Sequence, residues 1–187
     1  VMGVLASRLQ MDAGFDKQLP SGHEYTDTFF QHRDTLFGAN RLMVVVHARQ
    51  GTIWNVAFLR KLNDVTKAVL YLPGVDRRTV SSLWTPNTRV LTITDEGFKA
   101  RDVIGGDVTA ERLTEAQIAQ IRDNVVTGGY IGSLVANDAS GAMVVADLLD
   151  MDPQTKAKTD YIALGQRLET ALRAQFEDAT VEVQIIG

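Results

Sequence analysis

The stretch that organises this chain, residues 72–87, reads LPGVDRRTVSSLWTPN. Pro73 and Gly74 end a helix, because proline cannot donate the next amide hydrogen and glycine adopts dihedral angles that other residues resist. A strand is expected over 79–85, and at Pro86 the chain leaves the sheet for a long excursion. The stretch holds no nucleophile, metal cluster or phosphate-binding loop, so its chemistry predicts a structural role.

Two regular elements precede this stretch. Residues 41–49 alternate apolar side chains on one face and are also largely apolar on the other face near the centre, which predicts an interior strand. Asn55 is the expected N-cap of a helix that runs to about Tyr71. The apolar residues expected on the buried face of this helix recur at steps of four, three and four positions: Phe58, Leu62, Val65 and Val69.

Further elements follow Pro86. Thr114 and Gln117 form a capping box that starts a helix over 115–127. The other expected elements are, in chain order, a short strand over 89–94, a loop over 97–107, a hairpin with arms over 133–137 and 142–149, a helix over 160–176 and a last strand over 181–185.

The resulting order is strand, helix, strand, insertion, strand, helix, strand. This order predicts an α+β fold, a ferredoxin-like split βαβ sandwich with an antiparallel sheet and its helices on one face. The insertion covers about 86–131. An additional helix is expected over 22–37, where Ser21 and Glu24 form a capping box, and residues 1–20 are an extended lead-in.

Length and composition narrow the classes of function. A chain of 187 residues is long enough for one compact domain, with or without a large insertion. The net charge of −4 provides no basic stripe, which disfavours nucleic acid. The absence of cysteine removes disulfides and thiol nucleophiles and is compatible with cytosol or periplasm. No run approaches 18 apolar residues, and the apolar stub at 1–6 is either the trimmed end of a membrane helix or a cloning remnant.

Residues that could carry catalysis or bind metal are sparse. None of the three histidines is paired at the spacing of a metalloprotease. Asp147, Asp150 and Asp152 lack the alternation and glycine of a calcium loop and are better explained as solvated carboxylates. The glycines at 128–132 follow a helix and precede a strand, the reverse of a phosphate-binding turn. The chain is therefore expected not to be an enzyme and to need no metal or cofactor.

Three aromatic residues remain as candidates for substrate binding: Trp84, Phe98 and Tyr130. They flank or lie in the insertion and its loops, away from the regular helix lines. Burying such a side chain is worth about 2–3 kcal/mol, so each is first expected to belong to the core or to a satellite of it. An exposed position would instead indicate a lipophilic ligand or partner.

The chain resembles the first periplasmic loop of the resistance-nodulation-division (RND) superfamily, in particular the branch of predicted lipid or hydrophobe exporters. The residues that carry the resemblance are LPGVD at 72–76, SLWTPN at 82–87 and IGSLVAND at 131–138, which runs into GAMV at 141–144. LP at 19–20 and GANR at 38–41 are also similar to that family. The similarity extends over nearly the whole chain.

The resemblance implies a single periplasmic porter domain over 1–187, with membrane helices on both sides of it in a bacterial inner-membrane protein. Residues 1–20 would then lead in from a membrane helix. The implied substrate is hydrophobic, a lipid of sterol or hopanoid type. The implied partners are the second periplasmic loop and the membrane helices of the same transporter, together with a possible periplasmic partner protein. Transport in the family is driven by the proton gradient through membrane-helix acids that lie outside this chain.

The alternative hypothesis is a free-standing ferredoxin-like module that senses a small polar metabolite as a dimer. It predicts a compact pocket at a subunit interface, whereas the transporter hypothesis predicts a hydrophobic substrate and flanking membrane helices.

Overall fold

The computed structural model describes residues 40–95, 97–151 and 156–186. The chain divides into two compact units, Val1–Asn40 and Arg41–Gly187. All helices and strands in the described residues belong to the second unit. The lead-in expected over 1–20 and the helix expected over 22–37 lie outside the described residues.

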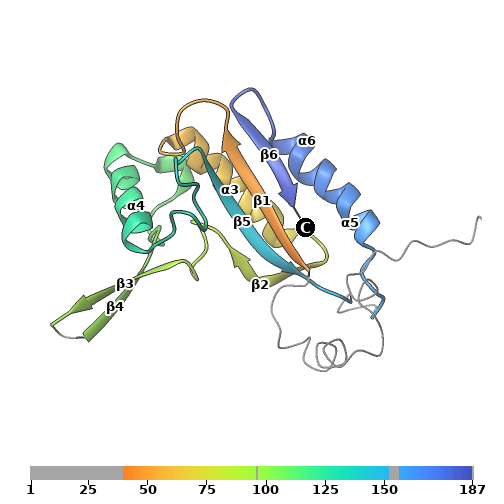
Figure 1. Cartoon of the computed structure of the whole chain (residues 1–187), viewed down its shortest axis with the longest axis horizontal. Helices are drawn as coiled ribbons and strands as arrows, with labels where there is room; N and C mark the ends of the chain where they lie inside the picture. Colours follow the sequence, from red (N-terminus) through yellow and green to blue (C-terminus); the bar gives the residue numbers. More distant parts are fainter. Residues whose placement is uncertain (1–39, 96, 152–155, 187) are drawn as a thin grey trace, which may run out of the picture. The chain divides into compact units, whose positions relative to one another are not determined.

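The second unit is built on a four-stranded sheet in which every neighbouring pair is antiparallel. Its strands are β1 (Arg41–Ala48), β2 (Val75–Ser81), β5 (Gly141–Leu148) and β6 (Val181–Ile186). The spatial order is β2-β5-β1-β6, so the first and third strands of the sheet are central and the other two are edges (Figure 1). This is the ferredoxin-like order, and it confirms the predicted fold class.

The register brings the apolar residues of the strands to one face. Val44 lies opposite Val144 of β5, and Val46 lies opposite both Ala142 of β5 and Val183 of β6. All of these side chains are buried. A shift of one residue would turn the whole set toward the other face, so this face selects the register.

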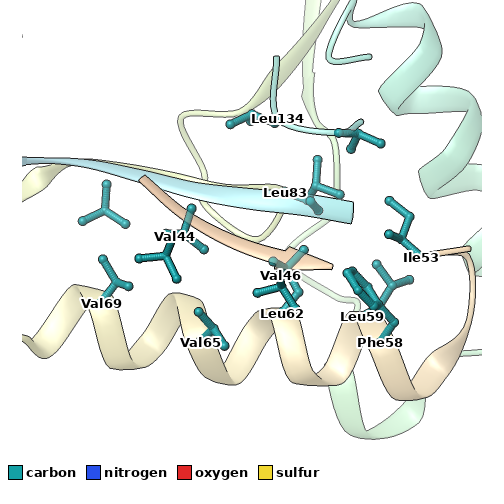
Figure 2. Packing of buried hydrophobic residues seen from close by; sticks show 14 of the residues in the cluster. Val44, Val46, Ile53, Phe58, Leu59, Leu62, Val65, Val69, Leu83 and Leu134 are labelled. Atoms are coloured by element: carbon teal, nitrogen blue, oxygen red, sulfur yellow. The ribbon is translucent and has the colours of Figure 1, made fainter. Parts of the chain in front are cut away.

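Helix α3 (Val56–Tyr71) packs on that face. Asn55 accepts the Phe58 amide at 2.8 Å, as expected of an N-cap, and the helix ends just before Pro73. The predicted buried line of the helix is confirmed. Figure 2 shows these side chains pointing from the helix toward the strands, among Val44 and Val46.

A second helical segment packs against α3 and β6. It comprises α5 (Tyr161–Leu168), a π-helical stretch Glu169–Arg173 and α6 (Ala174–Phe176). The span agrees with the helix predicted over 160–176. Leu172 of the π-helical stretch is fully buried, so α3 and this segment together cover one face of the sheet (Figure 1).

The strand predicted over 79–85 is wrong by four residues, because β2 covers Val75–Ser81. The pairing of β2 with β5 is also interrupted between Asp76 and Ser81. From Ser82 onward the backbone turns, since the Thr85 amide donates to the Ser82 carbonyl at 3.2 Å and the Thr88 amide donates to the Thr85 carbonyl at 3.0 Å. Serine and threonine hydroxyls stabilise this turn in competition with the strand ladder.

The insertion contains a separate two-stranded ribbon, β3 (Arg89–Thr94) and β4 (Gly97–Asp102), which is called the arm below. The strand predicted over 89–94 is confirmed. The loop predicted over 97–107 is wrong for its first six residues, which form β4. Gly97 has a φ of +118°, a value that glycine adopts easily. It closes the turn and lets the chain pair back on β3.

The rest of the insertion is a short 3-10 turn, Ala110–Arg112, and helix α4 (Glu115–Thr127). The capping box of Thr114 and Gln117 is present, which confirms the predicted start of this helix. Among the described residues, no helix is both long and apolar enough to cross a membrane.

The hairpin predicted over 133–137 and 142–149 is half right. Its second arm is β5, but its first arm forms no strand and is joined to β5 by a single isolated bridge, Val135 to Ala142. The Tyr130 carbonyl accepts the amides of Leu134 and Val135, both at 3.0 Å. These bonds, with Gly132 at a φ of +80°, curl the segment into turns instead of a strand.

Candidate functional site

The SLWTPN motif forms a turn held by buried hydroxyl groups. Thr85 Oγ1 accepts the Ser82 amide at 2.9 Å and donates to the Ser82 carbonyl at 2.8 Å, and Thr88 Oγ1 donates to the same carbonyl at 2.6 Å. The Ser82 hydroxyl also lies 2.9 Å from Thr66 Oγ1 on α3. All four side chains are buried, and among the described residues no buried polar side-chain atom lacks a hydrogen-bond partner. This turn therefore holds the start of the insertion in one position.

Trp84 joins this turn to α3. Its indole Nε1 donates to the Leu59 carbonyl at 2.9 Å, and its half-buried ring packs against the hydrophobic core. A buried face combined with a satisfied N–H is the usual arrangement of a structural tryptophan. The structure thus places Trp84 in the satellite-core position that the sequence first predicts.

Tyr130 holds the arm at its base. Its hydroxyl donates to the Arg89 carbonyl and accepts the Arg89 amide, both at 2.8 Å. Arg89 is the first residue of β3. Tyr130 is partly buried against the core, so it fixes the point at which the arm begins.

The other end of the arm is also fixed. Val103, directly after β4, is fully buried, and its amide donates to the Thr88 carbonyl at 3.0 Å. The buried Asn124 of α4 donates to the Val103 carbonyl at 2.9 Å. Both ends of the arm are thereby tied to the body of the unit.

Beyond this base, the arm exposes an apolar strip made of Leu91, Ile93 and Phe98. Phe98 is 82% exposed, Ile93 is 79% exposed and Leu91 is 67% exposed. Ile93 lies directly opposite Phe98 in the ribbon, and Leu91 lies opposite Ala100. Alternate residues of a strand share a face, so the three large side chains form one patch. Figure 1 shows the arm extending away from the four-stranded sheet.

The three candidates for substrate binding therefore do not form one site. Trp84 and Tyr130 lie at the base of the arm, whereas Phe98 is near its tip. Sequence reasoning missed Leu91 and Ile93. Their alternation within the predicted strand 89–94 was the available signal, but only the pairing with β4 places them beside Phe98.

A groove lies next to the arm. It is an open depression of about 800 Å³ lined mainly by α4, with Trp54 from the segment before α3 and Arg101 from β4. Its lining combines apolar side chains with charged ones: Trp54, Ile118, Ala119, Val126, Arg101, Glu115, Arg122 and Asp123, with Gln120 and Thr127. Val126 is 61% exposed. This depression is called the α4 groove below.

Charged residues mainly connect elements of the sheet body. Lys61 of α3 forms an ion pair with Asp178, which also accepts hydrogen bonds from the Thr180 hydroxyl and amide. These bonds, chiefly that from Lys61, hold the pKa of Asp178 well below its usual range. The side-chain hydrogen bond from Arg78 likewise lowers the pKa of Asp76 at the edge strand β2. Within the described ranges, no three His, Cys, Asp or Glu side chains are grouped to hold a metal ion.

No model of a known protein family matches the chain, and a search of curated proteins found no match.

Proposed function

We propose that this chain is the periplasmic porter domain of a proton-driven RND transporter in a bacterial inner membrane. It helps capture or conduct a hydrophobic substrate, a lipid of sterol or hopanoid type. Substrate enters a cleft shared with the second periplasmic loop of the same transporter, and movements of that pair couple to the membrane helices.

One observation carries the proposal: two of the motifs that resemble the family, SLWTPN and IGSLVAND, are segments that attach the insertion to the sheet body. SLWTPN supplies the hydroxyl turn and Trp84. IGSLVAND begins directly after Tyr130, whose hydroxyl holds the arm. Leu83 and Leu134, one from each motif, are both buried in the same core cluster (Figure 2). Residues from two separate motifs act together at this junction. A common structural role favours a true relation to the family over a chance match of short motifs.

The hydrophobic character of the substrate is supported by the exposed strip on the arm. Phe98 meets the condition under which the sequence predicts a lipophilic ligand or partner. The ferredoxin-like order of the sheet agrees with the topology expected of a porter domain.

The test uses the full-length protein purified from its own membrane in mild detergent. Lipids are extracted from it and quantified by mass spectrometry against an unrelated membrane protein prepared in the same way. Enrichment of a sterol- or hopanoid-type lipid is the expected result. A strictly polar cargo, or a gene that encodes no membrane helix on either side of this segment, would contradict the proposal.

A sensor of a small polar metabolite is the second candidate. The charged lining of the α4 groove favours it, but the groove is open and lined by one chain, whereas this hypothesis predicts a compact pocket at a subunit interface. Two arginines and two acids line this groove, which suits a zwitterionic or anionic small molecule. Calorimetric titration with amino acids and nucleotides tests this candidate. Binding that is lost in Arg122→Ala and retained in Arg77→Ala, which alters an arginine outside the groove, would support the sensor over the transporter.

A further inference from the structure

We infer that Arg173 and Glu177 close the free edge of β6 against pairing with another β-strand. The two side chains, called the edge clamp below, bond the backbone of Val183. The inference concerns self-association of the chain through its sheet and is independent of the proposed cargo.

β6 is an edge strand that needs protection. It pairs with β1 on one side, and in the described part of the chain no strand lies on its other side (Figure 1). Its sequence, VEVQII, has four β-branched residues in six positions and neither proline nor lysine. A short apolar segment of this kind on an open edge is a template for pairing between chains. Protection therefore has to come from outside the strand.

The edge clamp occupies both backbone groups of Val183. Arg173 Nε donates to the Val183 carbonyl at 3.2 Å, and the Val183 amide donates to Glu177 Oε2 at 3.3 Å. An added antiparallel strand would form the same two bonds, because a hydrogen-bonded pair of residues exchanges one amide and one carbonyl in each direction. The clamp thus takes the place of one residue of a fifth strand.

The neighbouring outward-facing position is occupied as well. Alternate residues of a strand direct their amide and carbonyl groups to the same edge, so Val181 and Ile185 face outward with Val183. The Val181 amide donates to Asp178 Oδ1, and the Val181 carbonyl accepts the Asp178 amide, both at 3.1 Å. In the described part of the strand this leaves at most Ile185 for an added strand. A single hydrogen-bonded pair contributes too little net free energy to hold a second chain.

The clamp is held in position by its own neighbours. Arg173 ends the π-helical stretch directly after the fully buried Leu172, and it also forms an ion pair with Glu169 at 3.2 Å. Glu177 follows four residues later, and its amide donates to the Arg173 carbonyl at 2.9 Å. The other carboxylate oxygen of Glu177 accepts from Arg49 Nη2 at 3.0 Å. Because both clamp groups are already oriented, an incoming strand would have to displace bonds that cost little entropy to keep.

The opposite edge of the sheet is protected by other means. The pairing of β2 with β5 is interrupted between Asp76 and Ser81. The Arg78 amide donates to Asp76 Oδ1 at 3.1 Å, and the Val80 carbonyl accepts from Asn87 Nδ2 at 3.0 Å. An irregular edge resists strand addition. Side chains thus bond the backbone at both edges of the sheet, which favours a protective role for the clamp.

The first experiment compares self-association of the 187-residue chain and its variants by sedimentation equilibrium. Glu177→Ala frees the Val183 amide and is expected to lower the dissociation constant for self-association by about tenfold or more. Glu177→Gln keeps an acceptor oxygen without the charge and should behave as the wild type. Glu169→Ala is the matched control, since it removes a carboxylate that bonds Arg173 and leaves the bonds to Val183 in place. Circular dichroism verifies that all variants are folded.

Arg173→Ala provides a second way to open the edge. It frees the Val183 carbonyl and should increase self-association in the same direction as Glu177→Ala. Amide hydrogen exchange tests the clamp within the monomer. In dilute solution the Val183 amide should exchange about tenfold faster in Glu177→Ala than in the wild type or in Glu177→Gln.

A spin label identifies the surface through which the opened variants associate. The chain contains no cysteine, so Gln184→Cys introduces a single thiol at an exposed position of β6. Neighbouring strands lie about 4.8 Å apart, so pairing of two β6 strands would bring the two labels close together. Dipolar broadening of the label spectrum is expected in the Glu177→Ala background and in neither the wild-type nor the Glu177→Gln background.

Three outcomes would overturn the inference. Glu177→Ala and Arg173→Ala could both self-associate no more than the wild type. Glu169→Ala could self-associate as strongly as Glu177→Ala, which would assign the effect to lost charge. The labels at position 184 could also remain uncoupled in an associated sample of Glu177→Ala, which would place the contact away from β6.

Discussion

The four-stranded sheet and the arm are both antiparallel, yet they hold their apolar side chains in opposite ways. In the sheet, Val46 of β1 faces buried partners on both neighbouring strands, Val44 faces the buried Val144 of β5, and both valines are themselves fully buried beneath α3. In the arm, Ile93 and Phe98 also face each other, but both are mostly exposed. Strand pairing is therefore common to both regions, and the helical layer is present in only one.

This difference shows what each region contributes. Burial beneath α3 supplies most of the stability of the sheet, at about 1.5–3 kcal/mol for each large apolar side chain. The arm gains little from burial beyond Val90 at its base. Its position depends on a few hydrogen bonds at the two ends of the ribbon. Substitutions in the two regions are expected to affect different measurements.

The largest effect is expected for Leu62→Ala. Leu62 is fully buried on α3, so the substitution should lower the free energy of unfolding by about 2–5 kcal/mol through lost burial and a cavity. Urea denaturation followed by circular dichroism measures it. Leu91→Ala on the arm is the matched control and should change stability by less than about 0.5 kcal/mol. Equal losses in both variants would show that the arm is as much a part of the core as α3.

A smaller decrease in the free energy of unfolding is expected for Thr85→Val, at the junction between the sheet body and the arm. The substitution keeps the shape of the side chain but removes the hydroxyl that bonds both the amide and the carbonyl of Ser82. Leaving the buried Ser82 amide unpaired should cost about 1–3 kcal/mol in urea denaturation. Thr92→Val, at an exposed threonine of β3, is the control. A stability unchanged in Thr85→Val would mean that the hydroxyl turn does not hold the insertion.

Tyr130→Phe should act mainly on the arm. It removes the hydroxyl that bonds both backbone groups of Arg89, at a cost of about 0.5–1.5 kcal/mol. Amide hydrogen exchange should show faster exchange at Arg89 and in β3, with little change in β1 or β5. If exchange rises equally in the sheet, the arm and the sheet open as one cooperative unit.

The smallest expected effect is on the pH dependence of the free energy of unfolding, through Asp178 in the sheet body. Folding lowers the pKa of Asp178, so its contribution to stability is present above its unfolded pKa and is lost as the pH falls through that value toward the folded one. Asp178→Asn should reduce the loss of stability between about pH 5 and pH 2, the window of carboxylate titration. Because Asp178 is largely exposed, solvent screening keeps the effect small.

A substitution of Lys61, the ion-pair partner of Asp178, provides a second test of this pH dependence. Lys61→Gln removes the leading cause of the lowered pKa and should reproduce part of the change seen in Asp178→Asn. A pH profile that neither variant alters would assign the acid sensitivity of the domain to other carboxylates.

Much of the fold was predictable because its signals are local. The step of four, three and four residues in α3, the capping box at Thr114 and the alternation in β1 each follow from the period of one element. Their order then implied the ferredoxin-like arrangement. The errors arose where hydrogen bonds between backbone and side chain compete with a ladder, at Ser82–Thr85 and at residues 133–137.

The candidate site was less predictable than the fold. Trp84, Phe98 and Tyr130 are equivalent by residue type and by their location around the insertion, yet two of them stabilise the base of the arm and one is exposed on it. Nothing local distinguishes them. Tyr130 is anchored by a residue 41 positions away, and Phe98 gains its neighbours through pairing across a turn.

The sequence by itself determined the order of the helices and strands of the sheet body and, except for β2, their approximate bounds, because periodicity and caps act over a few residues. The tertiary structure alone decided that Ser82–Thr85 is a turn, that residues 97–102 form a second strand, and that Leu91, Ile93 and Phe98 lie together outside the helical layer. Whether a side chain is covered depends on elements distant in the chain, and local pattern does not encode their arrangement.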